Sequence, residues 1–293
     1  MRNQMEGYVW LNGRITAAAR ARVSVFDRGF LYGDGLFETV RCYRGMPFLL
    51  DAHLQRMQGS AEFFGFPVPR VDWSAAIHKL LAANALLDRD ASVRITVTRG
   101  TAPPGLVPPK NPEPTVLAFA LPIPEQLSRD QKRGVKVITV PSYRSGPLAT
   151  HKLLDYVAAI LARSAAGKRK AQEALYVEDG YIAEATTANV FAVTQNDVLV
   201  TPPVNHLLPG ITRGLVISLA ERAKILTVER RISVGELCQA REVFLTSAVV
   251  EVLPVVEVDG LRIGGGKPGP TTLLLQGLYR QQVNQIVLGR ERK

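Results

Sequence analysis

The stretch ATHKLLDYVAAILAR, residues 149–163, places Lys152 directly before a run of apolar residues. The apolar residues recur at helical spacing: Leu153, Leu154, Val157, Ile160 and Leu161. This pattern predicts an amphipathic helix that begins at Lys152 and packs one face on a core. A lysine in this position usually extends into solvent. The alternative is an amine held in a pocket to form a Schiff base with a carbonyl cofactor.

The bulk composition predicts a two-domain protein of ordinary globular type. The chain has 293 residues, of which 46% are hydrophobic and 21% charged. This length is enough for two cores, since a domain typically holds about 100–200 residues. No apolar run is long enough to cross a bilayer, and the first residues lack the features of an export signal. The two cysteines, Cys42 and Cys238, form no disulfide framework, so we expect a cytoplasmic protein.

The charge of the chain is strongly basic, with a formal net value of +10 at pH 7. The basic residues are scattered and no aromatic residues interleave with them, which favours a solvated surface that attracts anionic substrates. A non-enzymatic basic protein that binds nucleic acid is the remote alternative. The four histidines lack ligand spacing, so we expect no metal site. We therefore expect small-molecule substrates, with neither nucleic acid nor membrane as a partner.

Short strands and helices alternate in both halves of the chain, which predicts an α/β fold with a small-molecule site between two domains. The polar stretch 122–134 contains two prolines and is interpreted as the linker. The expected domains are therefore an N-terminal domain over 1–121 and a C-terminal domain over 135–293. Residues 101–112, TAPPGLVPPKNP, predict a loop of functional length. Asn12-Gly13 predicts a hairpin turn, and Asp51 is expected to cap a helix that ends near Phe64.

Two segments of the C-terminal half could bind a charged ring and a phosphate. Glu184 ends a predicted strand, and a carboxylate facing inward needs a partner such as a protonated heterocyclic nitrogen. Pro209-Gly210 precedes a helix that is expected to begin at Ile211 or Thr212. The unpaired amides of such a helix start bind phosphate well. Each segment also has an ordinary explanation, as a turn residue or a helix cap.

Two further segments add groups for an anion. Arg56 follows His53 by three residues on one helix face, and arginine pairs naturally with phosphate. Thr246-Ser247-Ala248 ends a predicted strand, where hydroxyls and amides can meet an anion. A surface arginine and a plain strand end are the ordinary explanations. Together, the lysine, the carboxylate and the phosphate-binding groups form the set that pyridoxal 5′-phosphate requires.

The order and content of these motifs resemble the class IV, fold-type IV pyridoxal-phosphate enzymes. This family includes branched-chain aminotransferases, D-amino-acid aminotransferases and aminodeoxychorismate lyases. The resemblance runs from VFDRGFLYGDGLFETVR, residues 25–41, to KPGPTT, residues 267–272. It implies a two-domain α/β fold like that of D-amino-acid aminotransferases, with the cofactor in the cleft between the domains. It also implies a homodimer or larger assembly, in which a loop of the partner subunit reaches over the site.

The resemblance also implies roles for individual residues. Lys152 would be the catalytic residue that binds the cofactor covalently and moves protons, and Glu184 would keep the pyridine nitrogen protonated. The expected phosphate-binding groups are Arg56, Ile211, Thr212 and Ser247. The expected substrate-binding residues are Tyr32, Phe37, Arg94 and Ala248.

The resemblance predicts an aminotransferase that acts on a small amino acid, branched-chain or D-, and a 2-oxo acid. TPPVNHLLPGITR, residues 201–213, is similar to branched-chain enzymes, whereas YGDGLFET, residues 32–39, is similar to D-amino-acid enzymes and lyases. Pro104 stands where Bacillus-type D-amino-acid enzymes carry an arginine for the substrate carboxylate. The substrate's handedness therefore stays open. Aminodeoxychorismate lyase, which forms 4-aminobenzoate and pyruvate, is the alternative function.

Overall fold

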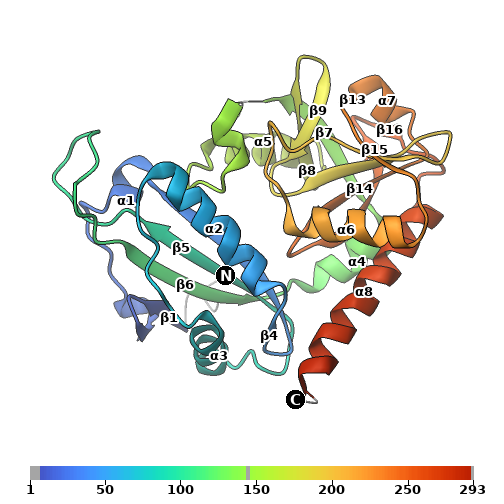
Figure 1. Ribbon diagram of the computed structural model, residues 1–293. Helices are drawn as coiled ribbons and strands as arrows, with labels where there is room; N and C mark the ends of the chain where they lie inside the picture. Colours follow the sequence, from blue (N-terminus) through green and yellow to red (C-terminus); the bar gives the residue numbers. More distant parts are fainter. Residues whose placement is uncertain (1–6, 143–145, 292–293) are drawn as a thin grey trace. The chain divides into compact units, whose positions relative to one another are not determined.

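The computed structural model describes residues 7–142 and 146–291, which form two compact α/β units (Figure 1). The first unit extends to Ile123 and also includes His151–Asp155. The second unit comprises Pro124–Thr150 and continues from Tyr156. The segment interpreted as a linker contains helix α4 (Glu125–Arg133), which belongs to the second unit. The expected α/β character is confirmed in both units, each of which has its own sheet.

The first unit contains a six-stranded antiparallel sheet in the order β2-β1-β6-β5-β3-β4. Its strands are β1 (Tyr8–Leu11), β2 (Arg14–Ala17), β3 (Gly35–Tyr43), β4 (Met46–Pro47), β5 (Ala91–Thr98) and β6 (Thr115–Pro122). Its helices are η2 (Ala18–Arg20), α1 (Arg28–Tyr32), α2 (Leu50–Phe64) and α3 (Trp73–Ala83). Figure 1 shows α2 lying across the sheet. The predicted hairpin is confirmed, because Asn12 and Gly13 both have positive φ between β1 and β2.

Helix α2 ends at Phe64 as predicted, but it does not start as predicted. The residue before the helix is Leu49, which has a left-handed backbone with φ of 52° and no capping side chain. Asp51 therefore lies within the first helical turn, where its charge suits the positive end of the helix dipole. At the other end, Gly65 adopts the left-handed conformation typical of a helix C-cap.

The second unit contains a ten-stranded mixed sheet in the order β12-β11-β10-β14-β15-β7-β8-β9-β13, with β16 paired to β15. Its strands are β7 (Val135–Pro141), β8 (Glu173–Glu178), β9 (Tyr181–Ala185), β10 (Asn189–Val193), β11 (Leu199–Thr201), β12 (Thr227–Glu229), β13 (Ile232–Ser233), β14 (Glu242–Ser247), β15 (Glu251–Val258) and β16 (Leu261–Arg262). Besides α4, its helices are η3 (Gly146–Thr150), α5 (Val157–Lys168), α6 (Ile211–Arg222), α7 (Val234–Cys238) and α8 (Pro270–Glu291). Helix α5 packs on β7 and β8, whereas α6 and α8 pack on β14.

The helix predicted to begin at Lys152 begins instead at Val157. Its buried face consists of small residues, namely Ala159, Ala162 and Ala166. The apolar side chains expected to pack on the core are exposed, with accessible fractions of 59–65%: Val157, Ile160 and Leu161. The prediction was wrong because alanines let the helix lie close to β8, so the larger residues occupy the outer face.

Lys152 itself lies in an extended segment that adds to the edge of β3. The amide of Phe37 donates a hydrogen bond to the carbonyl of Lys152 at 3.0 Å, and the amide of Leu154 donates to the carbonyl of Gly35 at 3.2 Å. Leu153 packs against the core of the first unit. The open edge of β3 therefore satisfies backbone groups of this segment that a helix would otherwise have satisfied.

Across residues 7–142 and 146–291, none of the helices is both long enough and apolar enough to span a bilayer. Within the same residues, the side chains of His, Cys, Asp and Glu form no cluster suited to a metal ion.

Candidate active site

Three of the expected site residues meet at one aromatic ring in the first unit. The ring of Phe37, on β3, is almost fully buried. The Lys152 amine Nζ lies 4.5 Å from the centre of this ring, and the guanidinium carbon of Arg94 lies 3.5 Å from it. Aromatic faces attract cations, so the ring holds both side chains near itself. An amine and a guanidinium are thus placed together beside an apolar surface.

The extended backbone determines which way Lys152 points. Successive side chains of a strand-like segment face opposite sides. His151 faces helix α2, where its Nδ1 lies 3.0 Å from the hydroxyl of Ser60, and burial lowers the pKa of this imidazole. Lys152 consequently faces the other side, toward Phe37.

Arg56 contacts Glu38 in the structure. Its Nε and Nη2 atoms donate to the two carboxylate oxygens of Glu38, each at 2.7 Å. The same carboxylate lies 2.7 Å from Nδ1 of His53, and its side chain is 1% exposed. Glu38 therefore forms a bidentate ion pair with the Nε/Nη2 edge of the Arg56 guanidinium. Glu38 is a residue whose partners the sequence did not predict.

Helix α2 nevertheless brings Arg56 toward the edge of the sheet where Lys152 lies. Arg56 and Ser60 are four residues apart, so they share one helix face. Ser60 contacts His151, which is the neighbour of Lys152 in the chain. Because Phe37 and Glu38 point to opposite faces of β3, Arg56 and Lys152 approach this edge from opposite sides of the sheet.

The contacts of Glu38 determine its ionisation. Burial by itself raises the pKa of this carboxyl. The hydrogen bond from His53 and the positive charge of Arg56 outweigh burial and lower the pKa to about 2. The carboxyl group is therefore ionised in the folded protein at all but strongly acidic pH. A pKa below that of the unfolded chain means that ionised Glu38 stabilises the fold above about pH 5 and loses this effect as the pH falls toward 2.

We expect Glu38→Gln to lower the free energy of unfolding by about 3 kcal/mol at neutral pH. The difference between wild type and variant should shrink as the pH falls toward 2, because the wild-type carboxylate then becomes protonated. Urea unfolding followed by circular dichroism over a pH series measures both quantities. Glu62→Gln, an exposed change on the same helix, is the control. A stability difference that stays constant over the whole pH series would contradict this account.

The predicted loop 101–112 is anchored at its base by helix α1. Arg28, which is buried, donates from Nη1 to the carbonyl of Gly105 at 2.7 Å. The amide of Gly105 in turn donates to the hydroxyl of Tyr32 at 2.8 Å. Leu106 and Val107 at the tip remain 83% and 86% exposed. Tyr32, expected to bind substrate, is thus a loop contact in this structure.

Glu184 lies in the second unit, on strand β9, and is 8% exposed. Its carboxylate accepts hydrogen bonds from Nδ2 of Asn189 at 3.4 Å and from the amide of Leu208 at 3.3 Å. Both bonds are long for a carboxylate acceptor.

Asn189 links Glu184 to the start of helix α6. Its Nδ2 also donates to the carbonyl of Leu208 at 2.9 Å. A Cβ atom at Gly210 would lie 1.9 Å from the Asn189 side-chain oxygen, so only glycine fits there. Helix α6 begins at Ile211, which is one of the two predicted starts, and no side chain caps it. The sequence analysis did not predict Asn189 and Leu208 as site residues. The available signal was that Asn189 follows Glu184 closely in the sequence and that Leu208 shortly precedes Gly210.

The end of strand β14 adds two hydroxyl groups. Thr246 pairs with Asn189 in the sheet and is 1% exposed. Its Oγ1 has no hydrogen-bond partner among the residues that the structure describes. The neighbouring Ser247 hydroxyl accepts a long bond, 3.4 Å, from the amide of Val250. A buried hydroxyl without a partner is costly, so the Thr246 hydroxyl is suited to a hydrogen bond with a bound group.

Residues 35–258 match the family model described as amino-transferase class IV. The chain belongs to the class IV aminotransferase family. It is accordingly an enzyme that uses pyridoxal 5′-phosphate, which confirms the predicted family, activity class and cofactor.

Several proteins that match this chain over nearly their whole length are named as aminotransferases. A Methanocaldococcus jannaschii protein provisionally named a branched-chain-amino-acid aminotransferase is 38% identical over 280 residues, covering 93% of this chain and 95% of that protein. A D-alanine aminotransferase of Bacillus licheniformis is 33% identical, with coverage of 94% and 96%. The solved branched-chain aminotransferase of Thermoproteus uzoniensis with norvaline is 30% identical, with a TM-score of 0.85 and coverage of 97% and 96%.

The second unit of this class IV aminotransferase contains groups that fit the phosphate and the ring nitrogen of the cofactor. The unpartnered hydroxyl of Thr246 and the uncapped start of α6 are donors suited to phosphate oxygens. Glu184 is a buried carboxylate suited to a protonated nitrogen. Ala248, an expected substrate residue, follows the two hydroxyl residues and is half-buried.

Proposed function

We propose that this class IV aminotransferase transfers the amino group of a small apolar amino acid, branched-chain or D-, to a 2-oxo acid. The observation that carries the proposal is the meeting of Lys152 and Arg94 on the ring of Phe37. It supports a site in which a guanidinium binds the substrate carboxylate while an amine acts close by. The apolar ring beside them suits a small apolar side chain.

Lys152 is proposed as the catalytic residue. When bound, pyridoxal 5′-phosphate supplies an electron-withdrawing ring that eases loss of a proton from the substrate Cα. Lys152 would hold the cofactor through its Nζ, and the same amine would accept the Cα proton as a general base. Its position beside Phe37 and Arg94 supports this role, because the substrate carboxylate and the reacting carbon are then held within reach of the same amine.

Glu184 is proposed to keep the proton on the ring nitrogen of the cofactor. Its burial and its long hydrogen bonds to Asn189 and Leu208 support this role. A carboxylate out of water binds a charged donor more strongly than neutral amides. Asn189 and Leu208 are positioning residues that hold the carboxylate in place.

The phosphate is proposed to bind the amides of Ile211 and Thr212, the hydroxyl of Thr212 and the hydroxyl of Ser247. We add Thr246 to this set, since its buried hydroxyl needs an acceptor or donor. Arg56 contributes positive charge to the phosphate, although Glu38 already engages one edge of its guanidinium.

We further propose that both units contribute residues to the binding of one cofactor molecule, with Lys152 acting as part of the first unit. The chemistry of the two sets of residues supports this. Lys152, Arg94 and Arg56 are all cationic and lie in the first unit. The carboxylate Glu184 and the hydroxyl residues lie in the second. The cofactor requires both sets.

The visible absorption spectrum of the purified protein tests the proposed reaction. We expect a yellow protein whose band is bleached by one class of amino acid when L- and D-amino acids are added separately without a 2-oxo acid. The amino acid that bleaches the band identifies the substrate class and its handedness. A yellow protein that no amino acid bleaches, and that releases 4-aminobenzoate from aminodeoxychorismate without an amino acceptor, would instead be the lyase.

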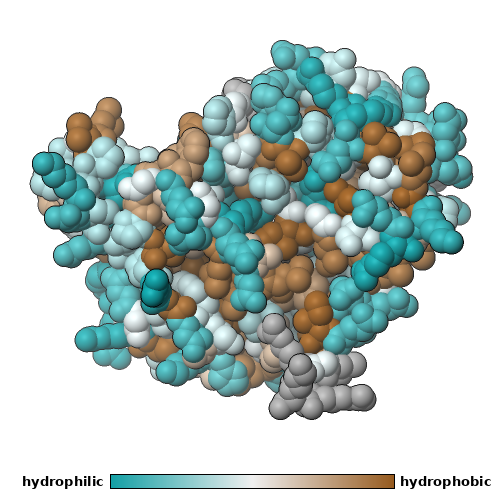
Figure 2. Space-filling model, viewed as in Figure 1, coloured by the Kyte–Doolittle hydropathy of each residue, from teal (hydrophilic) through white to brown (hydrophobic). Residues whose placement is uncertain are grey.

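A homodimer is proposed from the apolar surface of the first unit. Helix α1 and the preceding segment expose Val25, Phe26 and Phe30 at 64%, 51% and 74%. The anchored loop 101–112 adds Leu106 and Val107, and Figure 2 shows apolar atoms at its tip. Surfaces of this kind mark protein contacts. We propose that a second copy covers them and receives this loop over its own site. Analytical ultracentrifugation measures the mass, and a stable monomer would contradict the proposal.

We propose a cytoplasmic location for the enzyme. Cys42 and Cys238 are both free thiols in the structure, which supports a reducing compartment.

A further inference from the structure

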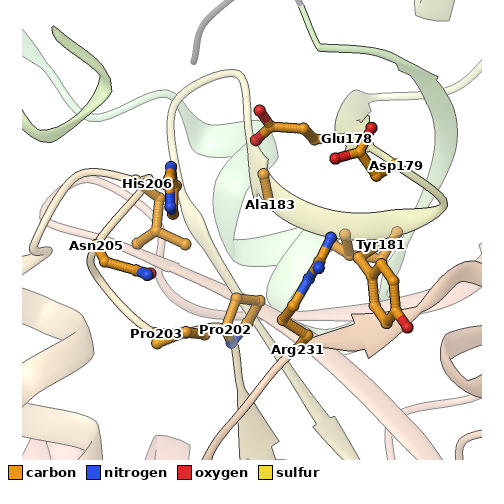
Figure 3. Close-up of a pocket in the computed structure, with 11 residues that line it drawn as sticks. Glu178, Asp179, Tyr181, Ala183, Pro202, Pro203, Asn205, His206 and Arg231 are labelled. Carbon is orange, nitrogen blue, oxygen red and sulfur yellow. The ribbon is translucent and has the colours of Figure 1, made fainter. Parts of the chain in front are cut away.

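A pocket of about 310 Å³ lies in the second unit, apart from every residue assigned above to the cofactor or substrate (Figure 3). Its volume is in the range of small-ligand sites. The apolar part of its lining is formed by Ile182, Ala183, Pro202, Pro203 and Leu207. Charged side chains of both signs complete the lining, together with a histidine: Glu178, Asp179, His206 and Arg231. The pocket therefore combines an apolar base with opposite charges.

Arg231 is held in place by stacking. Its guanidinium carbon lies 3.7 Å from the centre of the Tyr181 ring. Stacking orients the planar group and leaves its edge N–H groups available. Arg231 forms no ion pair with any residue of the described part of the chain, whereas its neighbour Arg230 pairs with Glu236. The guanidinium at this pocket is thus oriented without a carboxylate partner from its own unit.

Two carboxylates lie at the same pocket. Glu178 ends β8, and Asp179 begins the tight turn to β9 with a positive φ of 51°. Neither forms an ion pair with the residues that the structure describes in this unit. Figure 3 shows Asp179 on the side of Tyr181, His206 and Asn205 on the other side, and Glu178 between them. The strand end and the turn thus place two carboxylates in the lining of this pocket.

We propose that this pocket binds a free α-amino acid as a zwitterion. Arg231 binds its carboxylate, Glu178 and Asp179 bind its ammonium group, and its apolar side chain lies on the proline and aliphatic base. A simple anion would be repelled by the two carboxylates, and a simple cation by Arg231. A molecule with one charge of each sign satisfies both.

The pocket adjoins the segment that contacts Glu184. Leu207 lines the pocket, and the amide of the next residue, Leu208, donates to the Glu184 carboxylate. An amino acid bound here therefore touches the chain segment that holds Glu184. The proposal rests on the pocket's own side chains and does not depend on the proposed reaction.

Equilibrium dialysis of the holoenzyme with radiolabelled L-leucine, without a 2-oxo acid, tests the proposal. We expect wild type to bind one more equivalent per chain than Arg231→Ala, because losing hydrogen bonds to a charged group weakens binding about 10- to 100-fold. Glu178→Gln, at the other end of the ligand, should weaken the same site. Arg230→Ala, an exposed change at the neighbouring position, should bind as wild type does.

Two analogues distinguish a zwitterion site from simpler sites. N-acetyl-L-leucine lacks the ammonium group and isoamylamine lacks the carboxylate, so each should bind the Arg231-dependent site at least about 10-fold more weakly. Equal binding of N-acetyl-L-leucine would show an anion site and overturn the proposal. Equal stoichiometry in wild type and Arg231→Ala would also overturn it. Binding at the active site is common to all the variants, so failure of the proposed reaction would leave this difference intact.

Discussion

Lys152→Ala is expected to lower the rate of transamination at least about 1,000-fold, because it removes the amine proposed to hold the cofactor and to carry the proton. The variant should still fold, since the carbonyl that accepts from Phe37 belongs to the backbone. We expect cofactor to be lost on dialysis and the visible band of the wild type to be absent.

Borohydride reduction followed by mass spectrometry gives an independent measurement for Lys152. The wild-type chain should retain the mass of the cofactor on the peptide that contains residue 152, and the variant should not. Lys168→Ala, an exposed lysine at the end of α5, is the matched control and should behave as wild type. Cofactor found on another lysine of the wild-type chain would overturn the assignment.

Glu184→Gln is expected to reduce kcat about 100-fold or more, since it removes a negative charge from beside the proposed ring nitrogen. The amide keeps the shape of the side chain and can still accept from Asn189 and Leu208, so we expect little change in thermal stability. Glu184→Asp keeps the charge and should recover part of the rate.

A spectroscopic titration separates the electrostatic role of Glu184 from a structural one. If Glu184 keeps a proton on the ring, Glu184→Gln should shift the pH dependence of the visible band, and Glu184→Asp should restore much of it. A variant with wild-type kcat and an unchanged titration would show that another group controls the ring nitrogen.

Much of the second unit could be predicted from its sequence because its signals are local. The Pro-Gly turn before α6 and the run of apolar residues in β8 and β14 each specify their element over a few neighbouring residues. Glu184 was identified in the same way, from its place at the end of a strand. The contact of Asn189 with Gly210 was not predictable, since side-chain packing joins two residues that are distant in the sequence.

The errors occurred where tertiary contacts outweigh local pattern. The apolar residues after Lys152 do recur at helical spacing. However, the segment 151–155 is extended and forms hydrogen bonds with the open edge of β3, so the helix begins only at Val157. The contact between Arg56 and Glu38 was also not predicted, because the two residues are 18 positions apart in the sequence. Neither contact can be predicted from the residue pattern within a single segment, because each joins residues from two separate segments.

The first unit is not a continuous piece of chain. Its sheet edge and its core are completed by His151–Asp155, which follow a stretch belonging to the second unit. During synthesis, the N-terminal sheet therefore cannot complete its edge until residue 155 has left the ribosome. A gene fragment that stops at Ile123 would encode a sheet with an open strand and without Leu153 in its core. The two units cannot be exchanged between proteins at a single boundary, so recombination that keeps Lys152 beside β3 has to cut the gene at more than one place.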